Sequence, residues 1–278
     1  MIENEIKKLN LDLAQIIKEN GNVISPDLEG FLLNGGKRIR PRIVFLILKM
    51  LNLEITPNHQ KLCLALEFLH NATLLHDDVI DNAILRRERE TINYKYNDKT
   101  STLLGDFVLS LALKKLSEIN NPKIIEIFSN NILCMTQGEL NQQFQKNKVP
   151  NISDYIEKTK NKTALLFWAG VESALLISDY KESFEEIKDF IINFGISFQI
   201  NNDLKSCEDK KNGVYTLPYI LFKQENPNCD IIDCDNKYFE KSKEFLSDLI
   251  NKTEKYLDFT NNDYKSEILE ITEKLKEF

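Results

Sequence analysis

Helical periodicity between widely spaced prolines is the feature that most constrains the fold of this chain. Apolar residues recur every three or four positions, as in the stripe from Ile2 to Ile17, which ends at Asn20 and Gly21. The same pattern predicts helices over 60–81, 103–118, 123–145, 153–178 and 185–206. Only 9 glycines and 7 prolines occur in 278 residues, and no long segment alternates with a period of two. We therefore expect residues 1–278 to form one all-α domain, a large bundle of roughly ten helices.

Composition and charge exclude several classes of protein. A net charge of −7 argues against a nucleic-acid partner, which needs a basic surface. No stretch approaches about 18 consecutive apolar residues, so no transmembrane helix is predicted, and the N-terminus has no apolar signal core. Five scattered cysteines without a CxxC pair support neither a zinc site nor a disulfide framework. We expect a cytoplasmic protein with reduced thiols.

Three carboxylates and two guanidiniums occur in one short segment, His-Asp-Asp-Val-Ile-Asp-Asn-Ala-Ile-Leu-Arg-Arg. On a helix, Asp77 and Asp81 lie one turn apart and share a face, with Asp78 beside them. Converging carboxylates need a cation, and Mg²⁺ is usually held by a few carboxylates together with substrate phosphates. Arg86 and Arg87 supply forked donors that suit phosphate oxygens. Taken alone, the segment could equally be a solvated acidic helix end followed by a basic turn.

A second polar group lies later in the chain. Gln199, Asn202, Asp203 and Ser206 fall at i, i+3, i+4 and i+7, which is one continuous face of a helix. Each can present an oxygen atom, and Asp203 carries the only formal charge. An exposed polar face is the simpler interpretation of this segment alone. Beside the cluster at Asp77 it becomes a candidate second wall for the same metals.

Two further segments suit anions. The turn over residues 34–42 carries four cations and two glycines, which allow close approach of a ligand to the backbone. The residues after Pro41 can begin a helix, whose N-terminus favours negative charge. Lys162 and Thr163, inside a predicted helix, offer an ammonium and a hydroxyl together. A basic surface turn and an ordinary exposed lysine are the alternatives.

Together these segments resemble the trans-isoprenyl (polyprenyl) diphosphate synthase family. The resemblance covers about two thirds of the chain, with five motifs in the family's order. The GGKRxRP loop is matched by Gly35-Gly36-Lys37-Arg38-Ile39-Arg40-Pro41, and the first aspartate-rich motif by Asp77-Asp78-Val79-Ile80-Asp81 with Arg86-Arg87. Three short elements follow: Lys162-Thr163-Ala164 (KTA), Phe198-Gln199-Ile200 (FQI) and Thr216-Leu217-Pro218 (TLP).

The resemblance implies an isoprenoid synthase fold, with helices around a deep central cavity, commonly in a homodimer. It implies Mg²⁺, up to three ions per active site, and condensation of isopentenyl diphosphate with an allylic diphosphate. It assigns the metals to Asp77, Asp81, Asp203 and Asn202, with Asp78 in support. It assigns the allylic diphosphate to Arg86, Lys162 and Gln199. It assigns isopentenyl diphosphate to Lys37, Arg40, His70 and Arg87, and includes Gly36 and Thr163 among the substrate-binding residues.

Several positions depart from the family pattern. The second aspartate motif, normally DDxxD, has Asn202 in its first position and Ser206 in its last. Because an Asn carbonyl is a neutral and weaker ligand for Mg²⁺, this wall should bind its metal less tightly. Val214 stands where a phosphate-binding Lys is common, and Glu88 and Glu90 stand where Gly and Pro often follow the arginine pair.

Two alternative functions fit parts of this pattern. A class I terpene cyclase shares the helical architecture, and Asn202 and Ser206 match the start of its Asn-x-x-x-Ser-x-x-x-Glu motif, but position 210 is Lys. A cyclase also has no need for a second diphosphate pocket. A catalytically poor partner subunit of a heteromeric prenyltransferase would explain the altered second motif but not the intact first one.

Product length is expected to depend on the residues one turn before the aspartates. In short-chain relatives a bulky aromatic there closes the tunnel for the product, whereas Ala72 and Thr73 are small. We therefore expect a geranylgeranyl or longer product. Candidates for the tunnel floor, each of which could equally be ordinary core, are Phe68, Leu69, Phe107 and Phe128.

Overall fold

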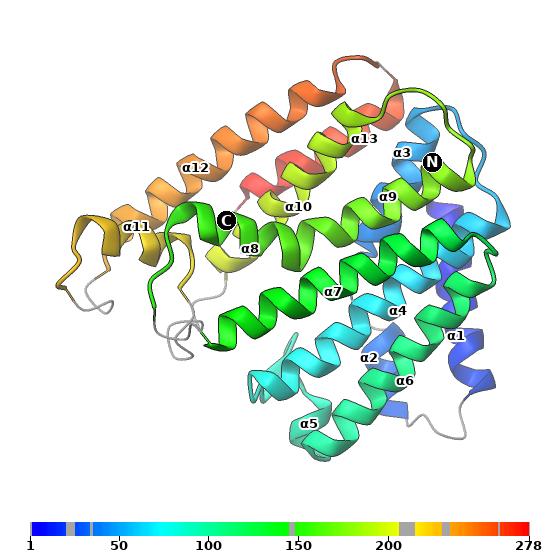
Figure 1. Ribbon diagram of the computed structural model, residues 1–278, viewed down its shortest axis with the longest axis horizontal. Helices are drawn as coiled ribbons and strands as arrows, with labels where there is room; N and C mark the ends of the chain where they lie inside the picture. Colours follow the sequence, from blue (N-terminus) through cyan, green and yellow to red (C-terminus); the bar gives the residue numbers. More distant parts are fainter. Residues whose placement is uncertain are drawn as a thin grey trace. The chain divides into compact units, whose positions relative to one another are not determined.

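The computed structural model describes residues 2–20, 26–33, 36–144, 148–205, 215–229, 234–260 and 262–277. Its α-helices are α1 (Glu3–Glu19), α2 (Pro26–Leu33), α3 (Ile39–Met50), α4 (Pro57–Ile80), α5 (Ile92–Lys95), α6 (Asp98–Ser117), α7 (Pro122–Phe144), α8 (Ile152–Thr159), α9 (Leu165–Ile177), α10 (Glu185–Lys205), α11 (Leu217–Glu225), α12 (Asn236–Glu254) and α13 (Asp263–Glu273) (Figure 1). The all-α prediction is confirmed. Ser206 and Val214 lie outside the described residues.

The contacts divide the chain into two compact units. Unit 1 comprises Met1–Ile125 and Ser173–Asp179, and unit 2 comprises Glu126–Glu172 and Tyr180–Phe278. The first aspartate motif belongs to unit 1 and the second to unit 2. That the whole chain is one domain around a central cavity stays a prediction.

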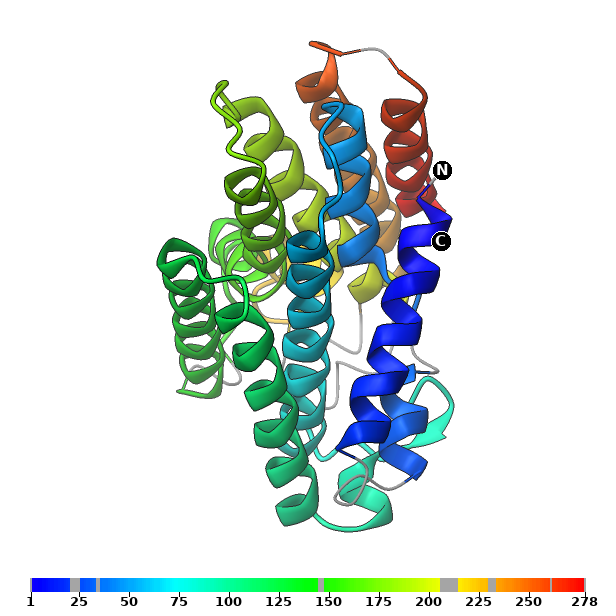
Figure 2. The same cartoon turned by 90° about the vertical axis from the view of Figure 1, so that its right-hand side faces the viewer.

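In unit 1, α4 and α6 lie side by side along most of their lengths (Figures 1 and 2). Helix α4 begins at Pro57, three residues before the predicted start, because Thr56 and His59 form a capping box and a proline fits the first turn. The side chains of Leu62, Leu66 and Val108 are fully buried. This packing fixes the helix that carries Asp77.

In unit 2, the core around α10 is aromatic. The rings of Phe167 and Phe194 meet edge to face with centroids 5.4 Å apart, and Phe198 lies 5.7 Å from Phe167. Gly195 allows close approach of the backbones, since a Cβ there would lie 2.5 Å from the Cα of Ala164. The residue before Ala164 is the predicted substrate-binding Thr163, which is thus held against α10.

Several predicted helix boundaries need correction. Helix α6 begins at Asp98, five residues before the predicted start at 103, because the Asn97 side chain caps it by accepting from the Thr100 N–H. The helix predicted over 153–178 is interrupted by a π-helical turn, η1 (Lys160–Ala164), which separates α8 from α9. Helix α3 begins at Ile39 rather than after Pro41, because the first turn needs no intrahelical N–H donors and so accepts proline. Helix α4 ends at Ile80, and Asp81 is its C-cap.

A short hairpin follows α4. Strands β1 (Leu85–Arg86) and β2 (Arg89–Glu90) pair antiparallel, and they are too short to show a period of two. The two turn residues, Arg87 and Glu88, have φ angles of 52° and 63°. This left-handed conformation is the one that glycine adopts without strain, so Glu88 carries a conformational cost where the family often has Gly.

No helix in the described ranges is both long enough and apolar enough to cross a membrane. Free thiols are present at Cys63, Cys134, Cys229 and Cys234. Cys207 lies outside the described residues.

Candidate active site

Arg38, the fourth residue of the GGKRxRP loop that begins at Gly35, anchors that loop inside unit 1. Its Nη1 donates to Oε2 of Glu67 at 2.6 Å, and both side chains are at most 5% exposed. Its Nε donates to Oδ1 of Asn10 at 2.9 Å, and its Nη2 donates to the Leu32 carbonyl at 2.9 Å. One guanidinium therefore joins α1, α2 and α4 to the loop, at a residue with a φ of 50°.

The cations predicted for isopentenyl diphosphate gather around this anchor. Burial lowers the pKa of Arg40, the charge of Glu67 opposes that shift and the charge of Arg87 adds to it; the resulting pKa of about 10 keeps Arg40 cationic at neutral pH. Gly36 lies against Arg87, because a Cβ at Gly36 would be 3.3 Å from Nη2 of that arginine. Lys37 is exposed beside them. The structure thus brings together residues from the loop and from the hairpin.

His70 joins the same group from α4. Burial, and then the neighbouring charges of Arg40 and Arg87, hold the pKa of His70 well below its ordinary value. The imidazole is therefore neutral at physiological pH. Since a neutral imidazole still carries one N–H, His70 can donate to a phosphate oxygen without adding a further positive charge to the arginines.

The three aspartates of the first motif occupy different environments. The Asp81 N–H donates to the Asp77 carbonyl at 2.8 Å, so these two residues stand one turn apart as predicted. Asp78 is fully buried instead, and its Oδ1 accepts a hydrogen bond from Nε of Arg86 at 2.7 Å. Burial raises the pKa of Asp78, and the charge of Arg86 opposes that shift. Asp78 therefore ties the hairpin to α4, which was not predicted.

His76 fixes the same end of α4 to α6. Its Nε2 lies 3.3 Å from the Thr102 carbonyl and 3.3 Å from Oδ1 of Asp106. Gly105 makes room for the ring, since a Cβ there would lie 2.3 Å from Nε2 of His76. The residue directly before Asp77 is thereby held in place.

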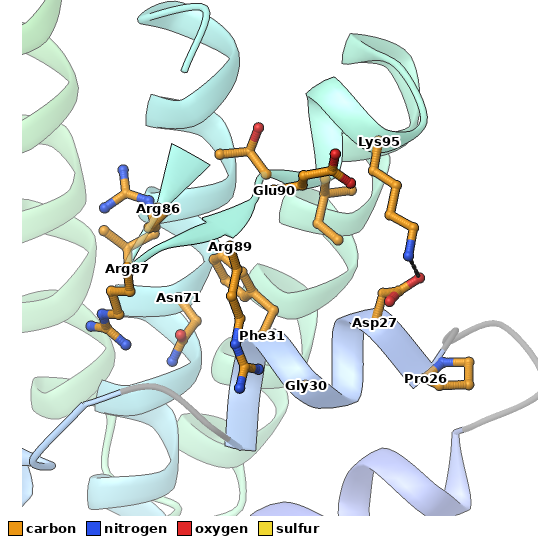
Figure 3. A pocket seen from close by; sticks show the side chains of 13 residues that line it. Pro26, Asp27, Gly30, Phe31, Asn71, Arg86, Arg87, Arg89, Glu90 and Lys95 are labelled. Carbon is orange, nitrogen blue, oxygen red and sulfur yellow. Dashed lines mark ion pairs between the residues drawn. The ribbon is translucent and has the colours of Figure 1, made fainter. Parts of the chain in front are cut away.

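A pocket of about 470 Å³ in unit 1 lies beside the two arginines. Arg86 and Arg87 line it together with Asn71, Phe31 and Arg89 (Figure 3). Asp77 and Asp81 are not among its lining residues. In the part of the chain that the structure describes, no group of three or more His, Cys, Asp or Glu side chains is already arranged to hold a metal ion.

In unit 2, Lys162 and Thr163 lie on the π-helical turn rather than on a regular helix. Nζ of Lys162 donates to Oε2 of Glu139 at 2.9 Å. Oγ1 of Thr163 donates to Oε1 of Gln199 at 2.8 Å. A π-turn is often found at functional sites, and this one carries both predicted substrate-binding residues.

Asp203 is hydrogen-bonded through both of its carboxylate oxygens. Oδ1 accepts from Nε2 of Gln199 at 2.7 Å, and Oδ2 accepts from the Tyr155 hydroxyl at 2.6 Å. Asn202, the neighbouring residue, is exposed. On the predicted polar face of α10, hydrogen bonds therefore hold the carboxylate of Asp203 in place, whereas the amide of Asn202 is exposed.

Ala72 and Thr73 lie on α4 within the two turns before Asp77. Ala72 is 1% exposed, and Thr73 is half-buried with its hydroxyl donating to the His70 carbonyl at 2.7 Å. Of the proposed floor residues, Phe68 is fully buried in unit 1 and Phe128 is buried in unit 2. The open tunnel stays a prediction.

Four residues that hold the site together were not predicted to do so: Arg38, Glu67, Glu139 and Tyr155. Arg38 and Glu67 could have been suspected, because charged residues in apolar segments need partners when buried. Tyr155 lies on the same helical segment as Thr163, but an α-helical register does not align the two. The π-turn that aligns them has no signal in hydrophobic periodicity.

The chain belongs to the polyprenyl synthetase family, whose model matches residues 23–244. A prenyl transferase of Cyanidium caldarium is 31% identical over 266 residues, which is 90% of this chain and 81% of that protein. The crystal structure of heptaprenyl diphosphate synthase from Staphylococcus aureus matches with a TM-score of 0.84 and 29% identity, covering 100% of this chain and 98% of that one.

A third similar protein, at 22% identity, has the same fold. It is a polyprenyl synthase from Caulobacter crescentus CB15 in complex with calcium and isoprenyl diphosphate, with a TM-score of 0.82 and coverage of 100% and 95% of the two chains. The isoprenoid synthase fold and the predicted family are thereby confirmed. The chain is a trans-prenyltransferase, a polyprenyl diphosphate synthase.

Arg38→Ala should destabilise the protein by about 3–5 kcal/mol, because it removes the guanidinium that is hydrogen-bonded to the buried Glu67 carboxylate. Urea unfolding followed by circular dichroism measures the cost. Arg42→Ala is the matched control: it removes an ion pair with Glu3, whose carboxylate is 60% exposed, and should cost less than about 1 kcal/mol. Equal losses in the two variants would show that the buried pair has no special role.

Proposed function

We propose that this polyprenyl diphosphate synthase elongates an allylic diphosphate with isopentenyl diphosphate in a Mg²⁺-dependent reaction and releases a product longer than farnesyl diphosphate. The observation that carries the proposal is the group of Arg40, His70 and Arg87, two cations and a neutral imidazole gathered in unit 1. Such a group suits a diphosphate that must be bound but not cleaved. The adjoining Asp77 and Asp81 suit the substrate whose diphosphate leaves.

The carboxylates of Asp77 and Asp81 in unit 1 fit magnesium by the chemistry of their donors, and so does the carboxylate of Asp203 in unit 2, which would serve a further ion. They are hard oxygen ligands, and a few such ligands together with substrate phosphates complete the coordination that Mg²⁺ prefers. Asn202 would add a neutral carbonyl. Bound Mg²⁺ supplies Lewis acidity that stabilises charge on the departing diphosphate.

The remaining residues bind and orient the two substrates. Arg86, Lys162 and Gln199 would hold the allylic diphosphate, with Thr163 fixing the amide of Gln199. Gly36, Lys37, Arg40, His70 and Arg87 would hold isopentenyl diphosphate. The pairing of Arg86 with Asp78 and of Lys162 with Glu139 means that the allylic diphosphate competes with a carboxylate for each cation.

The reaction then follows from these roles. The allylic C–O bond ionises, and donors placed around the leaving diphosphate stabilise its developing charge. The double bond of isopentenyl diphosphate attacks the allylic cation, and a proton is lost to the released pyrophosphate. Apolar surroundings protect the cation from water.

The product assay tests this proposal. Purified protein is incubated with labelled isopentenyl diphosphate and dimethylallyl, geranyl or farnesyl diphosphate, with and without Mg²⁺, and the products are resolved by chain length. We expect metal-dependent elongation beyond farnesyl. If no starter is elongated by the protein alone, a poor partner subunit becomes the better account, and Asn202 and Val214 are the first positions to restore to Asp and Lys.

Chain length should respond to Ala72→Phe. A phenyl ring one turn below the aspartates would fill the path of the growing chain, so the longest product should lose at least one isoprene unit while isopentenyl diphosphate is still consumed. Chromatography of the dephosphorylated products measures the change. An unchanged product for Ala72→Phe would place the end of the tunnel elsewhere.

A homodimer is part of the proposal. Helix α6 exposes two large apolar side chains, Leu103 at 59% and Leu113 at 44%, which a second copy of the chain would cover. Sedimentation equilibrium should give twice the mass of the chain, and Leu103→Asp with Leu113→Asp should reduce it to the single mass. A monomeric wild-type protein would contradict the dimer. A cytoplasmic location likewise stays a prediction.

A further inference from the structure

The hydroxyl of Tyr155 is a polar group whose partner lies in the second aspartate motif. The side chain is 3% exposed, and its hydroxyl donates to Oδ2 of Asp203 at 2.6 Å. Gln199 donates to the other oxygen of the same carboxylate at 2.7 Å, and Thr163 donates to Gln199 at 2.8 Å. Three hydrogen bonds thus run from Thr163 through Gln199 and Asp203 to Tyr155.

The π-turn over Lys160–Ala164, which contains Thr163, makes this arrangement possible. In a regular α-helix, residues eight apart point about 80° away from each other. A π-turn rotates less per residue than an α-helix, so it turns Thr163 back toward the face that carries Tyr155. Both then meet α10, where the absence of a side chain at Gly195 allows the close approach to Ala164.

The hydrogen bonds from Tyr155 and Gln199 hold the carboxylate of Asp203 in one rotamer. Asn202 is neutral and exposed, so Asp203 is the charged donor of this motif within the described residues. The groups that hydrogen-bond to metal-binding side chains commonly control metal affinity, and their loss lowers affinity or activity about 10- to 100-fold. A fixed carboxylate also loses less side-chain entropy when it binds a cation.

We propose that Tyr155 is a positioning residue, which orients Asp203 for the metal and compensates for the missing carboxylate at Asn202. The inference rests on the proposed metal role of Asp203. It assigns Tyr155 no contact with substrate. It predicts instead that the Tyr155 hydroxyl controls metal affinity. It also predicts that loss of the hydroxyl lowers metal affinity less when position 202 carries a carboxylate.

The test compares Tyr155→Phe with the wild-type protein and with Tyr238→Phe. Tyr238 is a matched control, because it is also buried in unit 2 and its hydroxyl also donates to a carboxylate, Oε2 of Glu225 at 2.9 Å. Mn²⁺ is titrated in the presence of inorganic pyrophosphate, and free Mn²⁺ is followed by electron paramagnetic resonance. Melting temperature and circular dichroism check that each variant is folded.

We expect Tyr155→Phe to weaken Mn²⁺ binding about tenfold, and to raise the Mg²⁺ concentration at half-maximal activity by the same factor with an unchanged KM for isopentenyl diphosphate. Tyr238→Phe should bind Mn²⁺ as the wild type does. In an Asn202→Asp background the effect of Tyr155→Phe should shrink, because two carboxylates then share the ion.

Unaltered Mn²⁺ binding in Tyr155→Phe would overturn the inference, and so would an equal loss in Tyr238→Phe. An undiminished effect in the Asn202→Asp background would contradict compensation. Failure of the proposed function is distinguishable from these outcomes: the wild type would then form no elongated product, whereas the Mn²⁺ titration would still report on Tyr155.

Discussion

The buried ion pair between Arg38 and Glu67 is the interaction on which the substrate-binding half of unit 1 depends. A buried pair gains little net stability, because desolvation offsets most of its attraction, but removal of one partner is costly. Its value here is geometric: one planar guanidinium fixes the loop before α3 against three helices. Lys37 and Arg40 flank that fixed residue, and His70 lies one turn after Glu67. The fixed loop therefore holds Lys37 and Arg40 in position to bind a substrate anion.

Two of the cations that would bind the allylic diphosphate are paired with carboxylates. Arg86 is paired with Asp78 in unit 1, and Lys162 is paired with Glu139 in unit 2. Each pair keeps an isolated charge from standing in a partly buried site, and each can be exchanged for a phosphate oxygen. Charge-assisted bonds to a polyanion are stronger than a half-exposed ion pair. The ion pairs thus hold Arg86 and Lys162 in a defined geometry before substrate binds.

Much of this architecture was predictable from local patterns, and the parts that were not depend on tertiary contacts. Periodicity predicted the ends of α4, α6, α7 and α10 to within five residues, since an amphipathic stripe reflects burial directly, but it did not predict α12. It missed the π-turn at Lys160–Ala164, because a single extra residue leaves the apolar pattern on either side intact. Motif spacing brought Asp77, Arg87 and Gln199 into consideration, and the family resemblance added His70. The hydrogen bond from Arg86 to Asp78 joins residues eight positions apart, and the one from Tyr155 to Asp203 joins residues 48 positions apart. No helical spacing encodes either contact.

In the proposed reaction, the loss of pyrophosphate from the allylic substrate is coupled to the addition of one isopentenyl unit. Simultaneous measurement of pyrophosphate release and isopentenyl incorporation, with farnesyl diphosphate as starter, tests it most directly. We predict one pyrophosphate released per isoprene unit added, and no release when isopentenyl diphosphate is omitted. Pyrophosphate release from farnesyl diphosphate alone, with a cyclic hydrocarbon as product, would contradict the account and make the protein a cyclase.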